Sequence, residues 1–162
     1  MNTKVKPIPE GFHTLTPYLM VKGAAQAIDF YKRAFGATER LRMAGPDGKS
    51  IAHAEITIGN SIVMLADECP ERGMSSPQTL KGTPVAFALY VEDSDAAFKR
   101  AVGAGATVLL PIADQFYGDR SGTVQDPFGH KWTLSTHKED LSPQELNSRM
   151  ADACAKMGQA KK

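Results

Sequence analysis

Residues 51–58 alternate between two kinds of side chain. Because successive side chains of a β-strand point to opposite faces, this segment predicts a strand with one apolar face and one mixed face. The apolar face would carry Ala52, Ala54, Ile56 and Ile58, and the mixed face Ile51, His53, Glu55 and Thr57. We expect the apolar face to pack under a helix, while the mixed face presents an imidazole and a carboxylate side by side.

The chain also contains an internal repeat. Residues 30–38 read FYKRAFGAT, and residues 98–107 read FKRAVGAGAT. In both copies apolar residues recur at helical spacing, which predicts two amphipathic helices. Gly36 and Gly105 follow where a residue in the left-handed conformation ends a helix, and Asp93 is a suitable N-cap for the second helix.

Strand-like segments surround each predicted helix. One run of β-branched and aromatic residues precedes each helix and three follow it, with turn residues between them. These runs are 18–21, 38–43, 51–58 and 61–66 in the first half, and 85–91, 107–112, 122–124 and 131–136 in the second. The pattern predicts two tandem β-α-β-β-β modules. Residues 69–83 join them, and a connection of this length indicates a crossover or a lid.

The C-terminal tail predicts a separate helix. Ser142 to Glu145 form a capping box with Pro143 at the first helical position. An apolar stripe follows at near-helical spacing, formed by Leu146, Met150, Ala153 and Met157.

Composition and charge narrow the functional classes. The 162 residues include 19 basic and 18 acidic side chains, a net charge of +1, which argues against a nucleic-acid binder. Cys69 and Cys154 belong to no C-x-x-C pair, so zinc ribbons and disulfide scaffolds are not expected. The sequence has neither a signal peptide nor an apolar run of membrane-spanning length. We therefore expect a cytoplasmic protein without a membrane partner.

The order and spacing of four short motifs resemble one known superfamily. They are Ala27 to Tyr31 (AIDFY), His53 to Ile56 (HAEI) before Gly59-Asn60, Leu89 to Asp93 (LYVED) and Asp126 to His130 (DPFGH). Over residues 14–136, these motifs and the duplication resemble the vicinal oxygen chelate superfamily. That superfamily includes glyoxalase I, bleomycin and fosfomycin resistance proteins and extradiol dioxygenases. Residues 114–120 (DQFYGDR), leading into DPFGHKW, further resemble its PhnB-like branch.

The resemblance implies an α+β fold. Modules at about 14–68 and 84–137, with linker 69–83, would form an incomplete barrel around a cavity within one domain of residues 1–138. Residues 139–162 would add the helical tail. Pairing of the modules within one chain or between two chains stays open, and we expect a homodimer.

The resemblance also places four metal positions, at Thr16, Glu55, Ala86 and Thr133. Only Glu55 is a plausible ligand, and His53 beside it would make at most a weak site, because divalent metals need three or more His, Glu or Asp side chains. We therefore expect no metal cofactor, with weak divalent binding as the exception.

By strand parity, the predicted cavity has a mixed lining that suits a small organic ligand. The lining residues would be Thr16, Tyr18, Met20, His53, Glu55, Ala86, Ala88, Tyr90, Lys131 and Thr133. Tyr117, Asp119 and Arg120 would lie on a loop that closes over it. Arg120 either binds an anionic ligand or forms a salt bridge with Asp119 or Asp126. Trp132, Phe30, Phe35, Phe87 and Phe98 are interpreted as core.

Three functional classes follow. The first is a binding protein for a small molecule that lacks the standard metal site, as in drug-sequestering relatives. The second is a lyase, isomerase or dioxygenase in which Glu55 is a general base or a sole metal anchor and His53 is its partner. The alternation of the strand alone is equally compatible with His53 and Glu55 facing solvent. The third class is a structural or partner-binding module that uses the C-terminal helix.

Overall fold

The computed structural model describes residues 5–159, and its first module follows the predicted order. Strand β1 (Tyr18–Val21) leads to helix α1 (Ala24–Phe35), followed by β2 (Thr38–Ala44), β3 (Ile51–Ile58) and β4 (Ser61–Asp67). The four strands form a sheet in the order β1-β4-β3-β2, with β1 parallel to β4 and the other pairs antiparallel.

The second module repeats this arrangement. It comprises β5 (Ala86–Tyr90), α3 (Ser94–Ala104), β6 (Thr107–Asp114), β7 (Asp119–Gln125) and β8 (Lys131–His137), with the sheet order β5-β8-β7-β6. Strand β7 is longer than the predicted 122–124, because its flanking residues pair with β8 over its whole length. The duplication inferred from the sequence is therefore confirmed.

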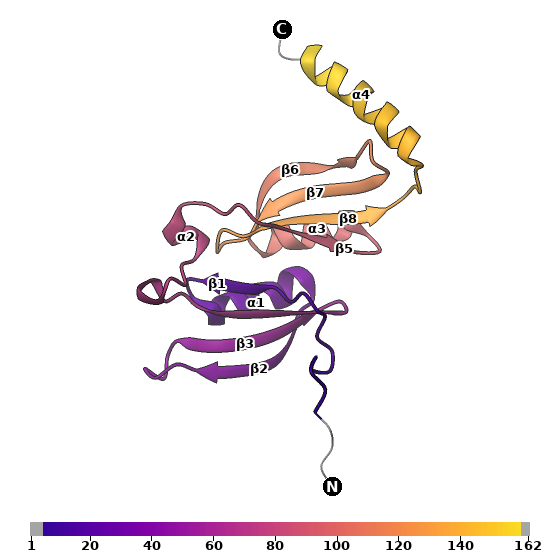
Figure 1. The fold of residues 1–162 in the computed structure, drawn as a ribbon. Helices are drawn as coiled ribbons and strands as arrows, with labels where there is room; N and C mark the ends of the chain where they lie inside the picture. The colour runs from indigo at the N-terminus through magenta and orange to yellow at the C-terminus, as the bar shows by residue number, and fades with distance from the viewer. Residues whose placement is uncertain (1–4, 160–162) are drawn as a thin grey trace.

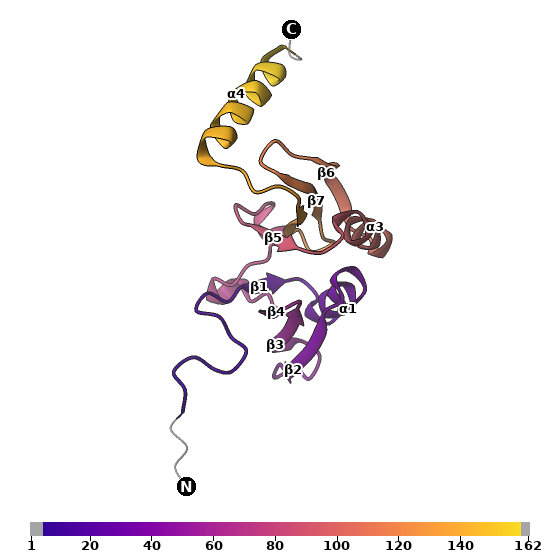
Figure 2. The same ribbon diagram turned by 90° about the vertical axis from the view of Figure 1, so that its right-hand side faces the viewer.

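The two sheets lie one above the other, with the β1 edge of the first toward the β5 edge of the second (Figure 1). Helices α1 and α3 lie on the same side of the sheets and pack against each other (Figure 2). The opposite side, which we call the open face, is not covered by these helices, and the sheets do not close into a barrel. The predicted α+β fold with an unclosed sheet arrangement is confirmed.

Helices α1 and α3 end as predicted, but they begin differently. Gly36 and Gly105 adopt the left-handed conformation at the helix C-termini, with φ of 67° and 115°. The side chain of Asp93 accepts a hydrogen bond from the Ala96 N–H and caps α3. Helix α1 has no side-chain cap of its own. Instead, Asp67 at the end of β4 accepts from the N–H groups of Gly23 and Ala24 and from Ile51.

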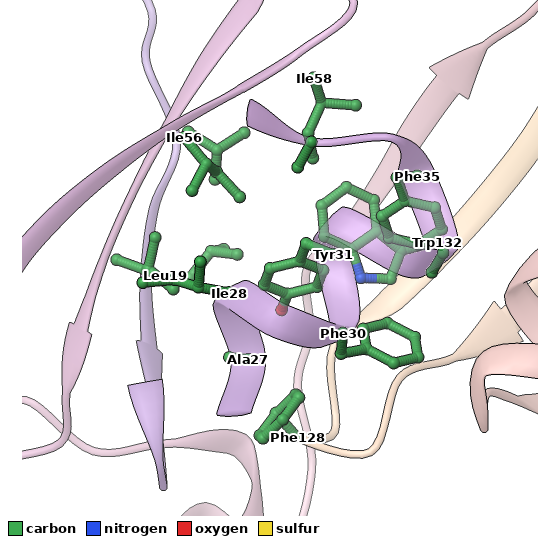
Figure 3. Close-up of a cluster of buried hydrophobic side chains, with 14 of the residues drawn as sticks. Leu19, Ala27, Ile28, Phe30, Tyr31, Phe35, Ile56, Ile58, Phe128 and Trp132 are labelled. Atoms are coloured by element: carbon green, nitrogen blue, oxygen red, sulfur yellow. The ribbon is translucent and has the colours of Figure 1, made fainter. Parts of the chain in front are cut away.

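An aromatic cluster joins the two modules (Figure 3). Tyr31 and Phe35 of α1 pack against Trp132 of β8, with ring centroids 5.5 and 4.7 Å apart. The interpretation of Trp132 as a core residue is confirmed, and Phe30 and Phe35 are buried as well. Phe87 and Phe98 are partly buried and pack against the same core.

The linker folds into short helical segments rather than a free loop. A 3-10 turn, Pro70–Arg72, is followed by the short helix α2 (Pro77–Leu80). The Gln78 side chain donates a 2.9 Å hydrogen bond to the Pro127 carbonyl, which attaches the linker to the second module.

The tail forms helix α4 (Pro143–Gln159) and begins with the predicted capping box. Glu145 accepts hydrogen bonds from Ser142, and the Glu145 N–H donates to the Ser142 hydroxyl. The helix extends away from both sheets (Figure 1). Its stripe is only partly sheltered: Leu146 and Ala153 are half-buried and Met150 is exposed, while the side chain of Met157 lies outside the described residues. No helix within residues 5–159 has the length and apolarity needed to span a membrane.

Candidate functional site

The first sheet carries a polar cluster on its open face. Strand alternation turns His53 and Glu55 toward this face, where both side chains are partly buried. The Tyr18 hydroxyl lies 3.0 Å from His53 Nδ1, and His53 Nε2 lies 3.5 Å from Glu55 Oε1. If Nε2 carries the proton toward Glu55, Nδ1 accepts from Tyr18, so one tautomer satisfies both contacts. The predicted juxtaposition of His53 and Glu55 is therefore observed.

Arg40 joins this cluster, which strand parity alone does not reveal. The register between β2 and β3 shifts between Glu39 and Leu41, and Arg40 lies at the shift. Its Nη1 is 3.5 Å from Glu55 Oε2, and its guanidinium lies 5.6 Å from the ring centroid of Phe12. The segment before β1 therefore contributes to the cluster, and it passes on the open side of the first sheet (Figure 2).

The second sheet has a cluster of its own. The Tyr90 hydroxyl donates a 2.8 Å hydrogen bond to Asp119, whose carboxylate also lies 2.8 Å from His137 Nδ1. Nε2 of the same ring lies 3.0 Å from Asp140, so a charged imidazolium satisfies both contacts. The hydrogen bond to Asp119, and then the one to Asp140, raise the pKa of His137 above its ordinary value.

The prediction that Asp119 lies on a loop closing over the cavity is wrong. Asp119 begins β7, where only 5% of it is exposed. The sequence does not identify His137 as a member of this cluster, because no local pattern shows which partner a histidine at a strand end will meet. Tyr117 lies on the turn before β7, as predicted, and its hydroxyl is 3.0 Å from that of Ser121.

Arg120 forms a salt bridge, which is one of the two alternatives that the sequence left open, but with partners other than Asp119 and Asp126. Its guanidinium donates to Asp95 at 2.6 and 2.8 Å and to Asp114 at 3.1 Å. It therefore ties α3 to the β6–β7 hairpin. Its side chain leaves β7 on the side opposite to Asp119, because the two residues are adjacent in a strand. Asp126, the other predicted partner, is occupied by Tyr31 and Trp132. These contacts favour the salt-bridge alternative for Arg120.

The other predicted lining residues divide between the two sheets. Thr16, Tyr18 and Met20 lie on or just before β1, while Ala86, Ala88 and Tyr90 belong to β5, and Lys131 and Thr133 to β8. The Thr133 hydroxyl lies 2.9 Å from that of Thr123 on β7. Thr16 donates to the His13 carbonyl.

Several hollows indent the protein near these residues. One of about 520 Å³ lies between the β2–β3 turn and the Cys69–Met74 hairpin and reaches Tyr18. Two smaller ones, of about 210 and 200 Å³, lie along the seam between the modules and share Phe87. Within one chain the predicted lining residues are thus spread over two sheets.

The repeat provides a test of the metal positions. In the alignment of the two repeats, Leu19 to Val21 match Leu89 to Val91, so Tyr18 corresponds to Ala88. In the sheets, Tyr18 pairs with Met64 of β4, and Ala88 pairs with Thr133 of β8. Met64 is therefore the counterpart of Thr133, whereas Glu55 lies on β3, which corresponds to β7. The assignment of Glu55 to a metal position is corrected to Met64.

The corrected set consists of Thr16, Met64, Ala86 and Thr133. Two neutral hydroxyls, a thioether and a methyl group do not suit a divalent metal that prefers carboxylate and imidazole ligands. Between residues 5 and 159, no three His, Cys, Asp or Glu side chains are grouped closely enough to hold a metal ion. The residues present therefore do not fit the metal that the superfamily implies.

Comparisons with known proteins agree with this fold. The sequence model of the Glyoxalase/Bleomycin resistance protein/Dioxygenase superfamily matches residues 11–134. An uncharacterized protein of Mycobacterium bovis is 48% identical over 140 residues, which cover 85% of this chain and 91% of that protein.

Solved structures are similar as well. The crystal structure of a gene product from Arabidopsis thaliana matches with a TM-score of 0.63 and 29% identity, over 76% of this chain and 98% of that one. TioX from Micromonospora sp. ML1 matches with a TM-score of 0.60 and 26% identity, over 80% of this chain and 100% of that one. A PhnB protein from Bacillus cereus, at 18% identity and a TM-score of 0.60 over 76% of this chain and 99% of that one, shares the fold. The chain therefore belongs to the Glyoxalase/Bleomycin resistance protein/Dioxygenase superfamily.

Proposed function

We propose that this protein binds a small organic molecule on its open face. The observation that carries the proposal is the polar cluster of Tyr18, His53 and Glu55, which lies among large exposed apolar side chains. Leu41 and Met43 stand opposite Glu55 and His53 on β2, and Tyr18, Leu41 and Met43 are 44%, 42% and 53% exposed. Exposed apolar surface of this kind around a few polar groups is typical of ligand and partner sites.

The second sheet offers a complementary set of contacts. Tyr90 and Tyr117 are exposed aromatic side chains, and Lys131 and Thr133 add a cation and a hydroxyl on β8. Met20 lines a hollow at the seam between the sheets, and Thr16 and Ala86 lie just before β1 and at the start of β5. An aromatic and aliphatic surface with few polar groups suits a ligand of mixed polarity. Membership of a superfamily that is named in part for bleomycin resistance proteins supports binding as the whole function.

We further propose that the protein works as a cytoplasmic homodimer. Helices α1 and α3 leave the open face uncovered, and a second copy would enclose a ligand lying there. Symmetric dimers are the commonest oligomers, and exposed sheet edges favour pairing. Cys69 and Cys154 are free thiols in the described structure, which is compatible with a reducing compartment.

A second candidate function rests on the distance between His53 and Glu55. Their closest side-chain atoms are 3.5 Å apart, and both groups are partly buried. In an enzyme, Glu55 would take a proton from a substrate bound on the open face, and His53 would orient it or return the proton. Such a protein would change its ligand chemically, whereas a binding protein would release it unchanged.

Two measurements test these proposals. Native mass spectrometry of protein purified from its host, followed by extraction, is expected to detect a co-purifying small molecule. The variants His53→Ala and Tyr18→Phe should weaken binding of that molecule, while Lys99→Ala on the exposed side of α3 should not. Equal affinity of all three variants would refute the open-face site. Incubating the molecule with excess protein and repeating the extraction distinguishes binding from turnover.

A further inference from the structure

The seam between the modules contains a preformed hollow of about 200 Å³. It lies where the linker passes from the first module to the start of β5. Apolar side chains from three elements form most of its wall: Met20 of β1, Pro77 and Leu80 of α2, and Val85 and Phe87 at β5. Ser75 and Thr83 also line it, and the Thr83 hydroxyl is engaged with the backbone of Val85.

Helix α2 holds one wall of this hollow in place. The Thr79 hydroxyl donates to Glu68 at 2.9 Å, and the Gln78 side chain donates to the Pro127 carbonyl at 2.9 Å. Gly129 lies directly against α2, because a Cβ atom there would be 2.8 Å from Pro77 Cβ. Since α2 is bound to both modules, the hollow exists before any ligand arrives, which lowers the entropic cost of binding.

His130 supplies a buried polar group at this wall. Only 7% of the residue is exposed, and its Nε2 lies 3.2 Å from the Met20 carbonyl oxygen. A carbonyl oxygen can only accept, so Nε2 carries the hydrogen, and Nδ1 of a neutral imidazole is then an acceptor. Among the residues that the structure describes, Nδ1 forms no hydrogen bond. Nδ1 keeps access to water, because among the described residues Ser94 Oγ is the buried side-chain atom without a hydrogen-bond partner. A ligand that fills the hollow displaces that water, so one that donates to Nδ1 has an advantage over one that leaves it unpaired.

We propose that this hollow is a binding site for a monocyclic, mostly apolar molecule with one hydrogen-bond donor, such as a phenol. The ring packs among Met20, Leu80 and Phe87, and the donor reaches Nδ1 of His130. The volume is sufficient, because an apolar cavity of about 150 Å³ binds benzene. The site uses neither His53 nor Glu55, although Tyr18 and Met20, which the open-face proposal also uses, line it as well. Its test reads His130 and Val85, which the open-face proposal does not use.

The test compares three probes of similar size at pH 8, where imidazole side chains are ordinarily neutral. Phenol has a donor, whereas anisole and toluene have none. Titrations followed by NMR are expected to give a Kd for phenol at least tenfold lower than for the other two, because a site built around a hydrogen bond rejects analogues that lack it. Phenol is also expected to shift the side-chain ¹⁵N signal of His130 Nδ1.

Matched substitutions locate the site. Val85, 54% exposed, lines the hollow, so Val85→Trp fills it and is expected to weaken phenol binding at least tenfold. Val102 on α3 is 37% exposed and does not line the hollow, so Val102→Trp should leave binding unchanged. The proposal is wrong if phenol fails to bind at millimolar concentration, if all three probes bind equally, or if Val85→Trp has no effect. The His130 signal is read in the unsubstituted protein, so the test does not depend on a His130 variant folding.

Discussion

Tyr31 donates a 2.8 Å hydrogen bond to Asp126, although 95 positions separate the two residues in the chain. The Asp126 carboxylate is buried and also accepts from Trp132 Nε1 and from the backbone N–H groups of Phe128 and His130. One carboxylate thus joins α1 of the first module to the turn and strand of the second. Burial, and then the charge of Asp126, raise the pKa of Tyr31 well above its ordinary value.

Removing the Tyr31 hydroxyl should therefore weaken the contact between the modules. Tyr31→Phe deprives a buried carboxylate of one donor, and hydrogen bonds to charged groups contribute roughly 1.5–3 kcal/mol. We expect a loss of this size in the free energy of unfolding, measured by urea denaturation. Tyr117→Phe is the control, because the Tyr117 hydroxyl meets the neutral hydroxyl of Ser121, and a hydrogen bond between neutral groups contributes only about 0.5–1.5 kcal/mol. Equal losses in both variants would contradict the role given to Tyr31.

Asp67 should contribute to stability by capping α1 from another element. Asp67→Ala removes the acceptor of three backbone N–H groups, and loss of a helix cap costs about 1–2 kcal/mol. Asp67→Asn keeps one acceptor oxygen and should lose less. Thermal unfolding would rank the two variants, with Asp29→Ala, on the exposed side of α1, as a control expected to have little effect. A ranking in which Asp29→Ala is as costly as Asp67→Ala would exclude the capping role.

His137 should make stability depend on pH. Its folded-state pKa is raised above the ordinary value of about 6.5, so its contribution is fully present below that value and is lost as the pH rises through the folded pKa. The wild-type Tm should therefore fall over this window, and His137→Gln should show a smaller fall. His13→Gln, on the exposed N-terminal segment, controls for removal of a histidine. Identical pH profiles for wild type and His137→Gln would disprove the effect.

The protein should contain little bound metal as purified. Because Thr16, Met64, Ala86 and Thr133 do not suit a divalent ion, we expect substoichiometric zinc, nickel, manganese and iron in elemental analysis of protein purified without chelator. One tightly bound metal per chain, lost on Glu55→Ala, would overturn this expectation and favour the enzymatic alternative.

The oligomeric state can be measured by sedimentation. We expect a homodimer, and a 17.5 kDa species that persists at high protein concentration would reject it. Helix α4 carries an apolar stripe away from its own sheets, so deleting the residues after Lys138 should weaken the dimer. A dimer unchanged by this deletion would exclude a role for α4 in it.

Local patterns predicted the elements of this fold well. The alternation at residues 53–58, the repeated helices that end at Gly36 and Gly105, and the capping box at Ser142 all reappear in the structure. At the start of the strand the predicted faces are wrong, because Ile51 is buried and Ala52 is exposed where the register with β2 shifts. Each of these features depends on residues close together in the chain, because helix and strand periodicity and helix caps are local properties. The same periodicity placed His53 and Glu55 side by side.

Other features depended on contacts between distant residues. Asp119 and Ser121 are residue types common in loops, so the sequence did not predict that β7 begins at Asp119. Without that start, the sequence could not predict the face of the sheet on which Arg120 lies. Only the pairing of β7 with β8 and the position of α3 determine that Arg120 meets Asp95. The metal positions likewise required the registers of β1 with β4 and β5 with β8, which identify Met64 as the counterpart of Thr133.

The sequence by itself thus determined the elements, their duplication and the superfamily, because these follow from periodicity and from short motifs in a fixed order. Tertiary structure alone decided which polar and charged groups meet: Tyr31 with Asp126, His137 with Asp119, and Arg40 with Glu55. A buried or half-buried polar side chain takes whichever partner the packing of sheets and helices brings within hydrogen-bond distance, and no local pattern encodes that distance.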